Sequence, residues 1–393
     1  MSTARRDFPQ LDAMRAVASL AVVATHAGFW SGYYTTGRFG VAVQRLEVGV
    51  AIFFVLSGFL LSRSYLVSTH DRVPHEPARR YFTKRVLRIF PVYLVSVVAA
   101  LTLIDENRSL GVARWIQNIF LVDLYREDQL PQGLTQMWSL TVEVAFYLLL
   151  PLLGAFFIRV LCRSGWQPVR LLGFLALVMV GSLAWVLVTH LAEGSWAGHA
   201  ARWLPAYATW FALGIGMAVL VIDSSAPGRV TGALIAAGSD RTSCWVAAAA
   251  VFAIVSTPLG GSPLLVAPTP AQAAMRHVCY ALVAVLVVAP CVLGSDDTPV
   301  ARVLSLPPLR HLGHISYAIF CCHVTVLAVG VPAMGFTVFD TSFPLLFGII
   351  LAISIVVAEV LYRAVEKPFM SLAPGRRRQT TPTTTPSDSA AHS

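Results

Sequence analysis

The sequence predicts an all-α fold, a polytopic integral membrane bundle of about ten transmembrane helices with both termini in the cytoplasm. The mean hydropathy of the 393 residues is +0.69. Only 12% of the residues are charged, about half the share found in a soluble domain. Ten apolar segments approach the length of ~20 residues that a helix needs to cross a bilayer. The distribution of Lys and Arg between the loops then gives the orientation.

Ten segments of the chain are candidates for crossing the membrane. In chain order they cover residues 13–30, 48–66, 88–104, 138–158, 170–191, 202–222, 243–258, 274–293, 310–332 and 343–364. The seventh, at 243–258, is the shortest. Residues 112–124, in the loop after the third segment, are apolar but too short to cross, so we expect an interfacial or re-entrant helix there.

Basic side chains concentrate in alternate loops. With the N-terminus in the cytoplasm, 21 of the 29 Lys and Arg residues fall on the cytoplasmic side, 7 on the opposite side, and Arg15 lies inside the first segment. This bias is typical of multi-pass membrane proteins. The net charge of +9 is therefore a topology signal, and no nucleic acid is expected as a partner.

We expect one functional domain. Residues 1–372 form the predicted transmembrane domain, and residues 373–393, rich in Thr, Pro and Ser, form a predicted disordered cytoplasmic tail. The six cysteines lack metal-site spacing, so no metal is expected. Because no soluble catalytic domain is evident, any chemistry must occur within the bundle.

Two ionisable residues occupy the first segment. Arg15 precedes His26 by eleven residues, almost three helical turns, so both project from about the same face, roughly 16 Å apart along the axis. Ionisable groups inside a membrane are costly and mark functional sites. One helix thus offers a cation near the cytoplasm and an imidazole deeper in the bilayer, in its outer half.

Glu143 is predicted at the same depth as His26. It lies near the start of the fourth segment, which runs inward from Trp138. A carboxylate and an imidazole at one level can form a base and its orienting partner. The alternative is a structural His–Glu pair that joins two helices.

Further arginines lie at the predicted level of Arg15. Arg85 and Arg88 are three residues apart, hence on one helix face. Three guanidiniums at one level make a phosphate site, because Arg pairs with phosphate through two parallel hydrogen bonds. The alternative is ordinary anchoring to lipid headgroups, which we favour for Arg79, Arg80 and Lys84.

Polar residues also mark the ninth segment. Ser316 and His323 are seven residues apart, so they share a face with Tyr317 close by. These polar side chains either line a cavity or form hydrogen bonds to neighbouring helices. In the second segment, Gly49 and Gly58 are expected to allow close helix approach.

Six elements of the sequence, taken together and in order, resemble the membrane acyltransferase-3 family over residues 10–370. They are Arg15 with His26; Phe53-Phe54-Val55-Leu56-Ser57-Gly58-Phe59; Arg85-x-x-Arg88-Ile89-x-Pro91-x-Tyr93; Trp138-Ser139-Leu140-x-Val142-Glu143-x-x-Phe146-Tyr147; Gly313-x-x-Ser316-Tyr317 with His323; and Glu366-Lys367-Pro368. One departure is Phe320, where relatives often carry an aromatic hydroxyl.

The resemblance implies an acyl-CoA-dependent O-acyltransferase, with acetyl as the default group and acyl-CoA as co-substrate rather than a resident cofactor. His26 would act as general base or transient acyl carrier, supported by Glu143. The implied acyl-CoA-binding residues are Arg15, Arg85, Arg88 and Tyr93. The implied acceptor and cavity residues are Trp138, Tyr147, Ser316, Tyr317 and His323. We also expect a continuous tunnel from the arginines to His26.

The implied acceptor is a carbohydrate or glycolipid of the cell envelope, and the implied location is a bacterial inner membrane. The Ala- and Arg-rich, Lys-poor composition suggests a GC-rich actinobacterium, where relatives acetylate mycolyl-trehalose glycolipids. Trp30, Tyr33, Tyr34, Trp196 and Trp203 could stack on sugars, but a membrane-edge aromatic belt explains them more simply. The alternative functions are a transporter or flippase, which would show inverted repeats, and an envelope scaffold, which needs no buried charges.

Overall fold

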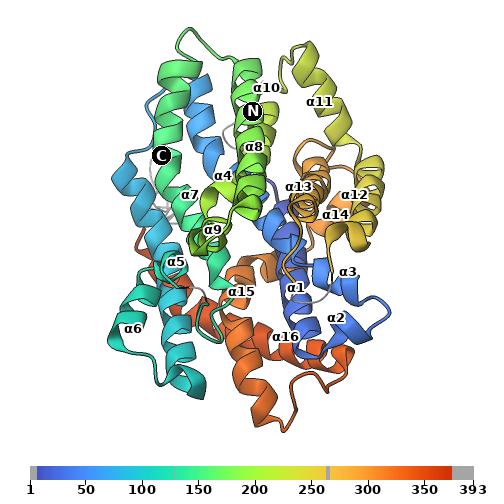
Figure 1. Cartoon of the computed structure of the whole chain (residues 1–393). Helices are drawn as coiled ribbons and strands as arrows, with labels where there is room; N and C mark the ends of the chain where they lie inside the picture. The colour runs from blue at the N-terminus through green and yellow to red at the C-terminus, as the bar shows by residue number, and fades with distance from the viewer. Residues whose placement is uncertain (1–6, 128, 263–265, 374–393) are drawn as a thin grey trace, which may run out of the picture.

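The structure is a computed structural model that describes residues 7–127, 129–262 and 266–373, and within those ranges it is helical and contains no strand. The helices form one bundle (Figure 1). The tail predicted at 373–393 lies outside the described residues, apart from Ala373.

Ten helices correspond to the ten predicted segments. They are α1 (Gln10–Trp30), α4 (Val48–His70), α5 (Ala78–Leu103), α7 (Met137–Phe156), α8 (Pro168–Leu191), α10 (Leu204–Asp223), α12 (Arg241–Val255), α13 (Pro270–Val292), α15 (Pro307–Ala333) and α16 (Phe343–Leu361). Seven shorter helices connect or extend them: α2 (Tyr33–Thr36), α3 (Gly40–Arg45), α6 (Val112–Ile119), α9 (Ser195–Ala200), α11 (Arg229–Ser239), α14 (Pro299–Leu304) and α17 (Lys367–Ser371).

In the described part of the chain, eight helical stretches are long and apolar enough to cross a membrane. The remaining two predicted segments differ from these. Helix α1 has 21 residues but carries Arg15 and His26. Helix α12 has 15 residues, or about 22 Å, less than the ~30 Å hydrocarbon core. The number of ten crossings and the cytoplasmic placement of both termini therefore stay predictions.

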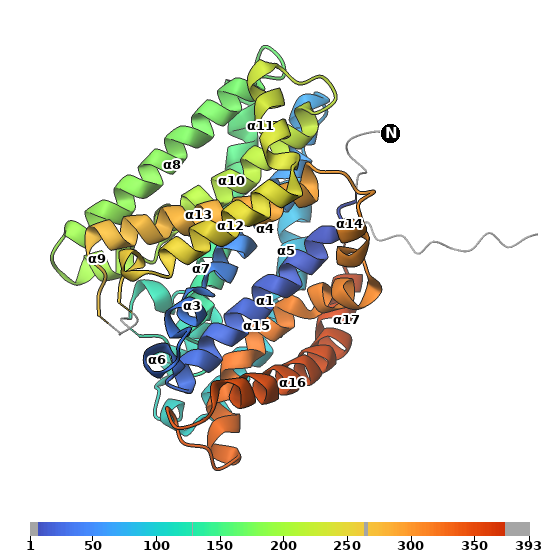
Figure 2. The same cartoon turned by 90° about the vertical axis from the view of Figure 1, so that its right-hand side faces the viewer.

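Helix α4 lies at the centre of the bundle. It contacts α10 and α13 on one side and α1 on the other. Beyond these, α8 packs on α10 and α12 on α13, whereas α15 and α16 follow α1 (Figure 2). Helix α7 also contacts α4, and α5 contacts α15. Residues of α1, α4, α5, α7 and α15 can therefore meet around one space.

Glycines permit the closest of these contacts. A Cβ at Gly58 of α4 would collide with the carbonyl of Phe211, and one at Gly214 of α10 with the carbonyl of Val55. Gly49 likewise lies against the backbone of α1 at Ala18. The close approach predicted for Gly49 and Gly58 is thus confirmed. Small residues let helix backbones pack tightly where lipid supplies little driving force.

The short helix predicted within 112–124 is also confirmed, as α6. Its loop is held by Arg114, whose guanidinium lies 3.3 Å from Asp123 and 2.6 Å from Glu127. Burial raises the pKa of Asp123, although Arg114 acts in the opposite direction. Leu121, at φ 58°, lies just beyond the end of the helix.

Helix α5 begins earlier than the hydropathy pattern predicted, at Ala78 instead of residue 88. Hydropathy detects only the apolar part of a helix, while Arg and Lys are good helix formers. Arg85 and Arg88 therefore lie on the same helix as the apolar segment. Their side chains can be directed into the bundle from its basic end.

Candidate functional site

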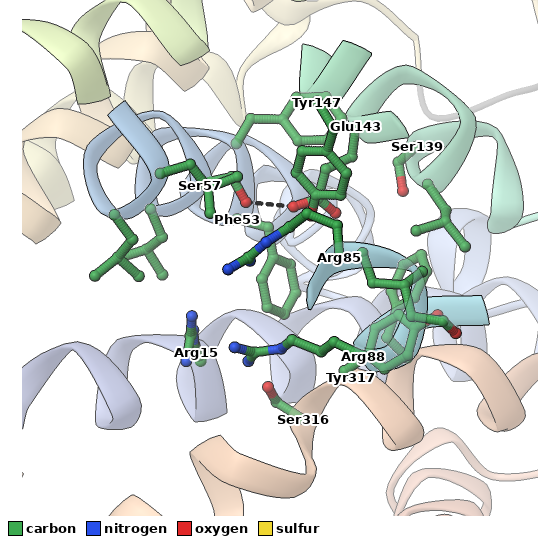
Figure 3. Close-up of a pocket in the computed structure, with 17 residues that line it drawn as sticks. Arg15, Phe53, Ser57, Arg85, Arg88, Ser139, Glu143, Tyr147, Ser316 and Tyr317 are labelled. Carbon is green, nitrogen blue, oxygen red and sulfur yellow. Dashed lines mark hydrogen bonds between the residues drawn. The ribbon is translucent and has the colours of Figure 1, made fainter. Parts of the chain in front are cut away.

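Three arginines from two helices line one cavity. Arg15 comes from α1, and Arg85 and Arg88 come from α5. In Figure 3 their guanidinium groups point toward one another across this space. We call it the arginine cavity; its volume is about 90 Å³, and Glu143, Tyr147, Ser316 and Tyr317 also line it. The structure thus brings together the three predicted phosphate ligands.

The positive charge of this cavity is only partly compensated. Asp12 lies 3.5 Å from Arg15, but it also lies 3.7 Å from Arg310 and 3.3 Å from His314. The buried Nε of Arg85 has no hydrogen-bond partner among the described residues. Guanidinium groups that repel one another and keep free donors are suited to binding an anion.

The predicted contact between His26 and Glu143 is absent. Glu143 of α7 instead accepts a hydrogen bond from Ser57 of α4, as Figure 3 shows. It lines the arginine cavity together with Arg15 and Arg85. Sharing a depth does not bring two side chains together when their helices present them to different neighbours.

His26 pairs with His323 of α15. The Nδ1 atom of His26 lies 2.8 Å from the carbonyl of Val22 and 3.2 Å from Nε2 of His323. Nδ1 of His323 faces the carbonyls of Ile319 and Phe320, at 3.1 and 2.8 Å. We call these two residues the histidine pair.

The hydrogen bonds of the histidine pair assign its tautomer. Because a carbonyl only accepts, Nδ1 carries the proton in both rings. Nε2 of His323 then accepts from His26. Nε2 of His26 keeps its lone pair and has no hydrogen-bond partner within the described ranges. His26 is therefore arranged as a base, and His323 orients it.

The expected continuous tunnel is interrupted. Neither histidine lines the arginine cavity; Phe320 does, and its ring centroid lies 6.0 Å from that of His323. Phe53 also lines the cavity and contacts Phe320. Aromatic side chains thus separate the cationic space from the histidine pair.

Of the other predicted residues, some line the arginine cavity and some lie elsewhere. Ser316 and Tyr317 line the arginine cavity; Ser316 donates to Gly313 and Tyr317 to the carbonyl of Ile89, each at 2.8 Å. Tyr93 does not line it. Its buried hydroxyl donates to the carbonyl of Asn118, which anchors α6, so Tyr93 is not placed to bind a ligand in this cavity.

Trp138 is also outside the arginine cavity. It lines a second one with Glu47, His277 and other residues. The sequence interpretation did not single out Glu47 or His277, although an ionisable residue in an apolar segment is the usual signal. Ser57 was interpreted only as part of a helix-packing segment, and its bond to Glu143 could not be foreseen from spacing.

In the part of the chain that the structure describes, no group of three or more His, Cys, Asp or Glu side chains could hold a metal ion. The six cysteines are buried and free. The acid–base and anion-binding groups above are thus the chemical groups that the fold gathers.

Comparisons with known proteins give the family. The family model described as an acyltransferase domain matches residues 8–363. Nodulation protein 10 of Rhizobium leguminosarum bv. viciae is 27% identical over 269 residues, 55% of this chain and 70% of that protein. Peptidoglycan O-acetyltransferase OatA of Listeria monocytogenes is 23% identical over 384 residues, 93% of this chain and 56% of that protein.

O-acetyltransferase OatA of Staphylococcus aureus is 27% identical over 203 residues, 48% of this chain and 31% of that protein. The chain thus spans about half the length of the Listeria relative and about a third of the Staphylococcus relative. No solved structure matches the chain significantly. Because the domain match extends over nearly the whole sequence, the chain belongs to the acyltransferase-3 family.

Proposed function

We propose that this protein transfers an acyl group, acetyl by default, from cytoplasmic acyl-CoA to a hydroxyl group of a cell-envelope carbohydrate or glycolipid. The observation that carries the proposal is the convergence of Arg15, Arg85 and Arg88 on one cavity. Two of the relatives are named O-acetyltransferases, which supports the reaction class.

The arginine cavity is the proposed site of the CoA phosphates. Arginine binds phosphate through two parallel hydrogen bonds and keeps its charge when buried. Arg85 lines the cavity, and its buried Nε has no hydrogen-bond partner among the described residues, so a phosphate group that reaches this atom would gain a donor. In the predicted topology this end of the bundle faces the cytoplasm, where acyl-CoA is found. The pantetheine arm would extend from there toward Phe53 and Phe320.

The histidine pair is the proposed acid–base centre. Nε2 of His26 removes the proton from the acceptor hydroxyl, whose oxygen attacks the thioester carbonyl carbon. An ester C–O bond forms, the C–S bond breaks, and the proton passes from His26 to sulfur, so CoA leaves as the free thiol. Because Phe320 stands between the arginine cavity and His323, its side chain must shift when the thioester arrives.

The proposal is tested with purified protein in nanodiscs, labelled acetyl-CoA and two acceptors. The acceptors are chitotetraose, a soluble neutral oligosaccharide, and a trehalose monoester embedded in the bilayer. A positioned general base contributes about 10²- to 10⁴-fold, so His26→Ala should lower acetyl transfer by at least about 100-fold. The matched control is His311→Ala, since His311 bonds to Glu359 at the bundle exterior.

Wild-type rates in His26→Ala would end the proposed role of that residue. Absence of label on both acceptors, and also on lipid extracted from the source membranes, would contradict acyl transfer itself. In sealed proteoliposomes, movement of the unlabelled glycolipid across the bilayer without acyl transfer would instead favour a flippase.

A further inference from the structure

The second cavity, which we call the aromatic cavity, is lined by the rings of Trp138, Tyr207, Trp210 and Tyr280. The ring centroids of Trp138 and Tyr207 are 5.0 Å apart, and those of Tyr207 and Trp210 are 5.1 Å apart. Its volume is about 190 Å³, whereas roughly 10–15 Å³ suffices for one water molecule. The rings come from three helices, α7, α10 and α13, and enclose space for a ligand larger than water.

The charges at the aromatic cavity balance. Glu47, just before α4, accepts a hydrogen bond of 2.8 Å from the hydroxyl of Tyr280. Arg276 of α13 lies 3.7 Å from the same carboxylate oxygen. A paired carboxylate and guanidinium can accept from and donate to hydroxyl groups without attracting net charge. The lining thus favours a neutral, hydrogen-bonding ligand.

His277 has an unmet polar atom in this cavity. The residue is only 6% exposed, and its Nε2 has no hydrogen-bond partner among the described residues. Its ring stacks on Trp210, with centroids 5.7 Å apart and planes at 17°. A buried polar atom without a partner is costly. A small turn of the His277 ring, which lines the cavity, would bring Nε2 to a ligand hydroxyl beside Trp210 and satisfy it.

Phe54 separates the two cavities. It lines the arginine cavity and is 1% exposed. Its ring also contacts those of Trp138, Tyr207 and Trp210, at 6.4, 5.9 and 5.9 Å between centroids. The aromatic cavity lies toward the start of α4 and α7, which the predicted topology places at the outer surface.

From this arrangement we propose that the aromatic cavity binds the neutral sugar ring of the acyl acceptor. The rings of Trp138 and Trp210 pack against the sugar face, and His277, Glu47 and Arg276 bond its hydroxyl groups. The assignment rests on the proposed acyl transfer for its biological meaning, but sugar binding can be measured without any transfer. Such a ring can belong to a glycolipid headgroup or to a free glycan, and the chemistry is the same.

The test is calorimetric titration of the nanodisc-embedded full chain with chitotetraose, and separately with the trehalose monoester. Trp210→Ala removes a stacking face and should raise the Kd of the bound sugar about tenfold. His277→Phe keeps a ring against Trp210 but removes Nε2, and should raise it about threefold to tenfold. The matched control is Trp196→Ala, because Trp196 is 51% exposed and lies outside the cavity.

A non-hydrolysable thioether analogue of acetyl-CoA is titrated in parallel. Weakened sugar binding in both cavity variants, with normal binding in Trp196→Ala and unchanged analogue binding, supports the assignment. Binding of only the trehalose monoester identifies a lipid-borne sugar, and binding of chitotetraose a free glycan. If Trp210→Ala does not fold, His277→Phe alone decides between support and refutation.

Two results would overturn the assignment. One is sugar binding that both cavity variants leave unchanged. The other is an absence of sugar binding in a wild-type protein that binds the acetyl-CoA analogue and transfers acetyl groups. Conversely, sugar binding without any acetyl transfer would leave this assignment standing and contradict the proposed function.

Discussion

The arginine cavity and the aromatic cavity lie on either side of Phe54, which lines the first and contacts rings that line the second, yet the two cavities differ in chemistry. Arg85 and Arg88 face the first with an excess of positive charge. At the second cavity, the charges of Glu47 and Arg276 balance each other. The group there without a hydrogen-bond partner among the described residues is Nε2 of His277. Polar groups left without protein partners indicate what each space is built to receive: an anion in one and a hydroxyl-bearing ring in the other.

The largest effect that would sharpen this comparison is expected from Arg85→Gln combined with Arg88→Gln. Each charge-assisted hydrogen bond contributes about 1.5–3 kcal/mol, and the variant loses one such bond or more at each arginine, so the Kd of the acetyl-CoA thioether analogue should rise at least about 100-fold. Sugar binding should not change.

The charge-matched control for that pair is Arg229→Gln combined with Arg302→Gln, since both residues are exposed. An equal loss of analogue binding in this control would indicate general attraction by the basic surface. A loss of sugar binding in the Arg85/Arg88 variant would contradict the assignment of the two ligands to separate cavities.

A smaller effect is expected at the histidine pair, which lines neither cavity as the structure defines them. His323→Leu removes the acceptor that orients His26. It should lower kcat about tenfold, a fraction of what a general base contributes, while leaving both KM values unchanged. His323→Gln keeps an acceptor atom and should recover most of the rate.

Equal losses in His323→Leu and His323→Gln would mean that His323 only fills space. A rise in the KM for acetyl-CoA alone would assign the histidine pair to the arginine cavity. A rise in the KM for the acceptor alone would assign it to the aromatic cavity. Steady-state kinetics with labelled acetyl-CoA at several acceptor concentrations separates these cases.

Much of the helical framework could be predicted from the sequence. Helical length and apolar composition locate the segments, and the basic loops place Arg15, Arg85 and Arg88 at one level. Their convergence in the structure follows because α1 and α5 both contact α15. The start of α5 could not be read from hydropathy, since its first turns are basic.

The partners of the buried groups could not be predicted. Depth along a helix is set by topology, but the rotation of each helix about its axis is set by packing. Glu143 therefore meets Ser57 and not His26, and Tyr93 turns toward Asn118. The aromatic cavity escaped prediction for the same reason: Trp138, Trp210 and His277 come from three different helices, and nothing in their spacing brings them together.

The most direct test of the account is a cryo-EM structure of the nanodisc-embedded protein with the acetyl-CoA thioether analogue bound. The account predicts that phosphate groups lie within hydrogen-bond distance of Arg85 and Arg88, with the Phe320 side chain displaced toward a thioether arm that approaches His26. Phosphate groups bound outside the arginine cavity, or an arm that ends away from the histidine pair, would contradict it.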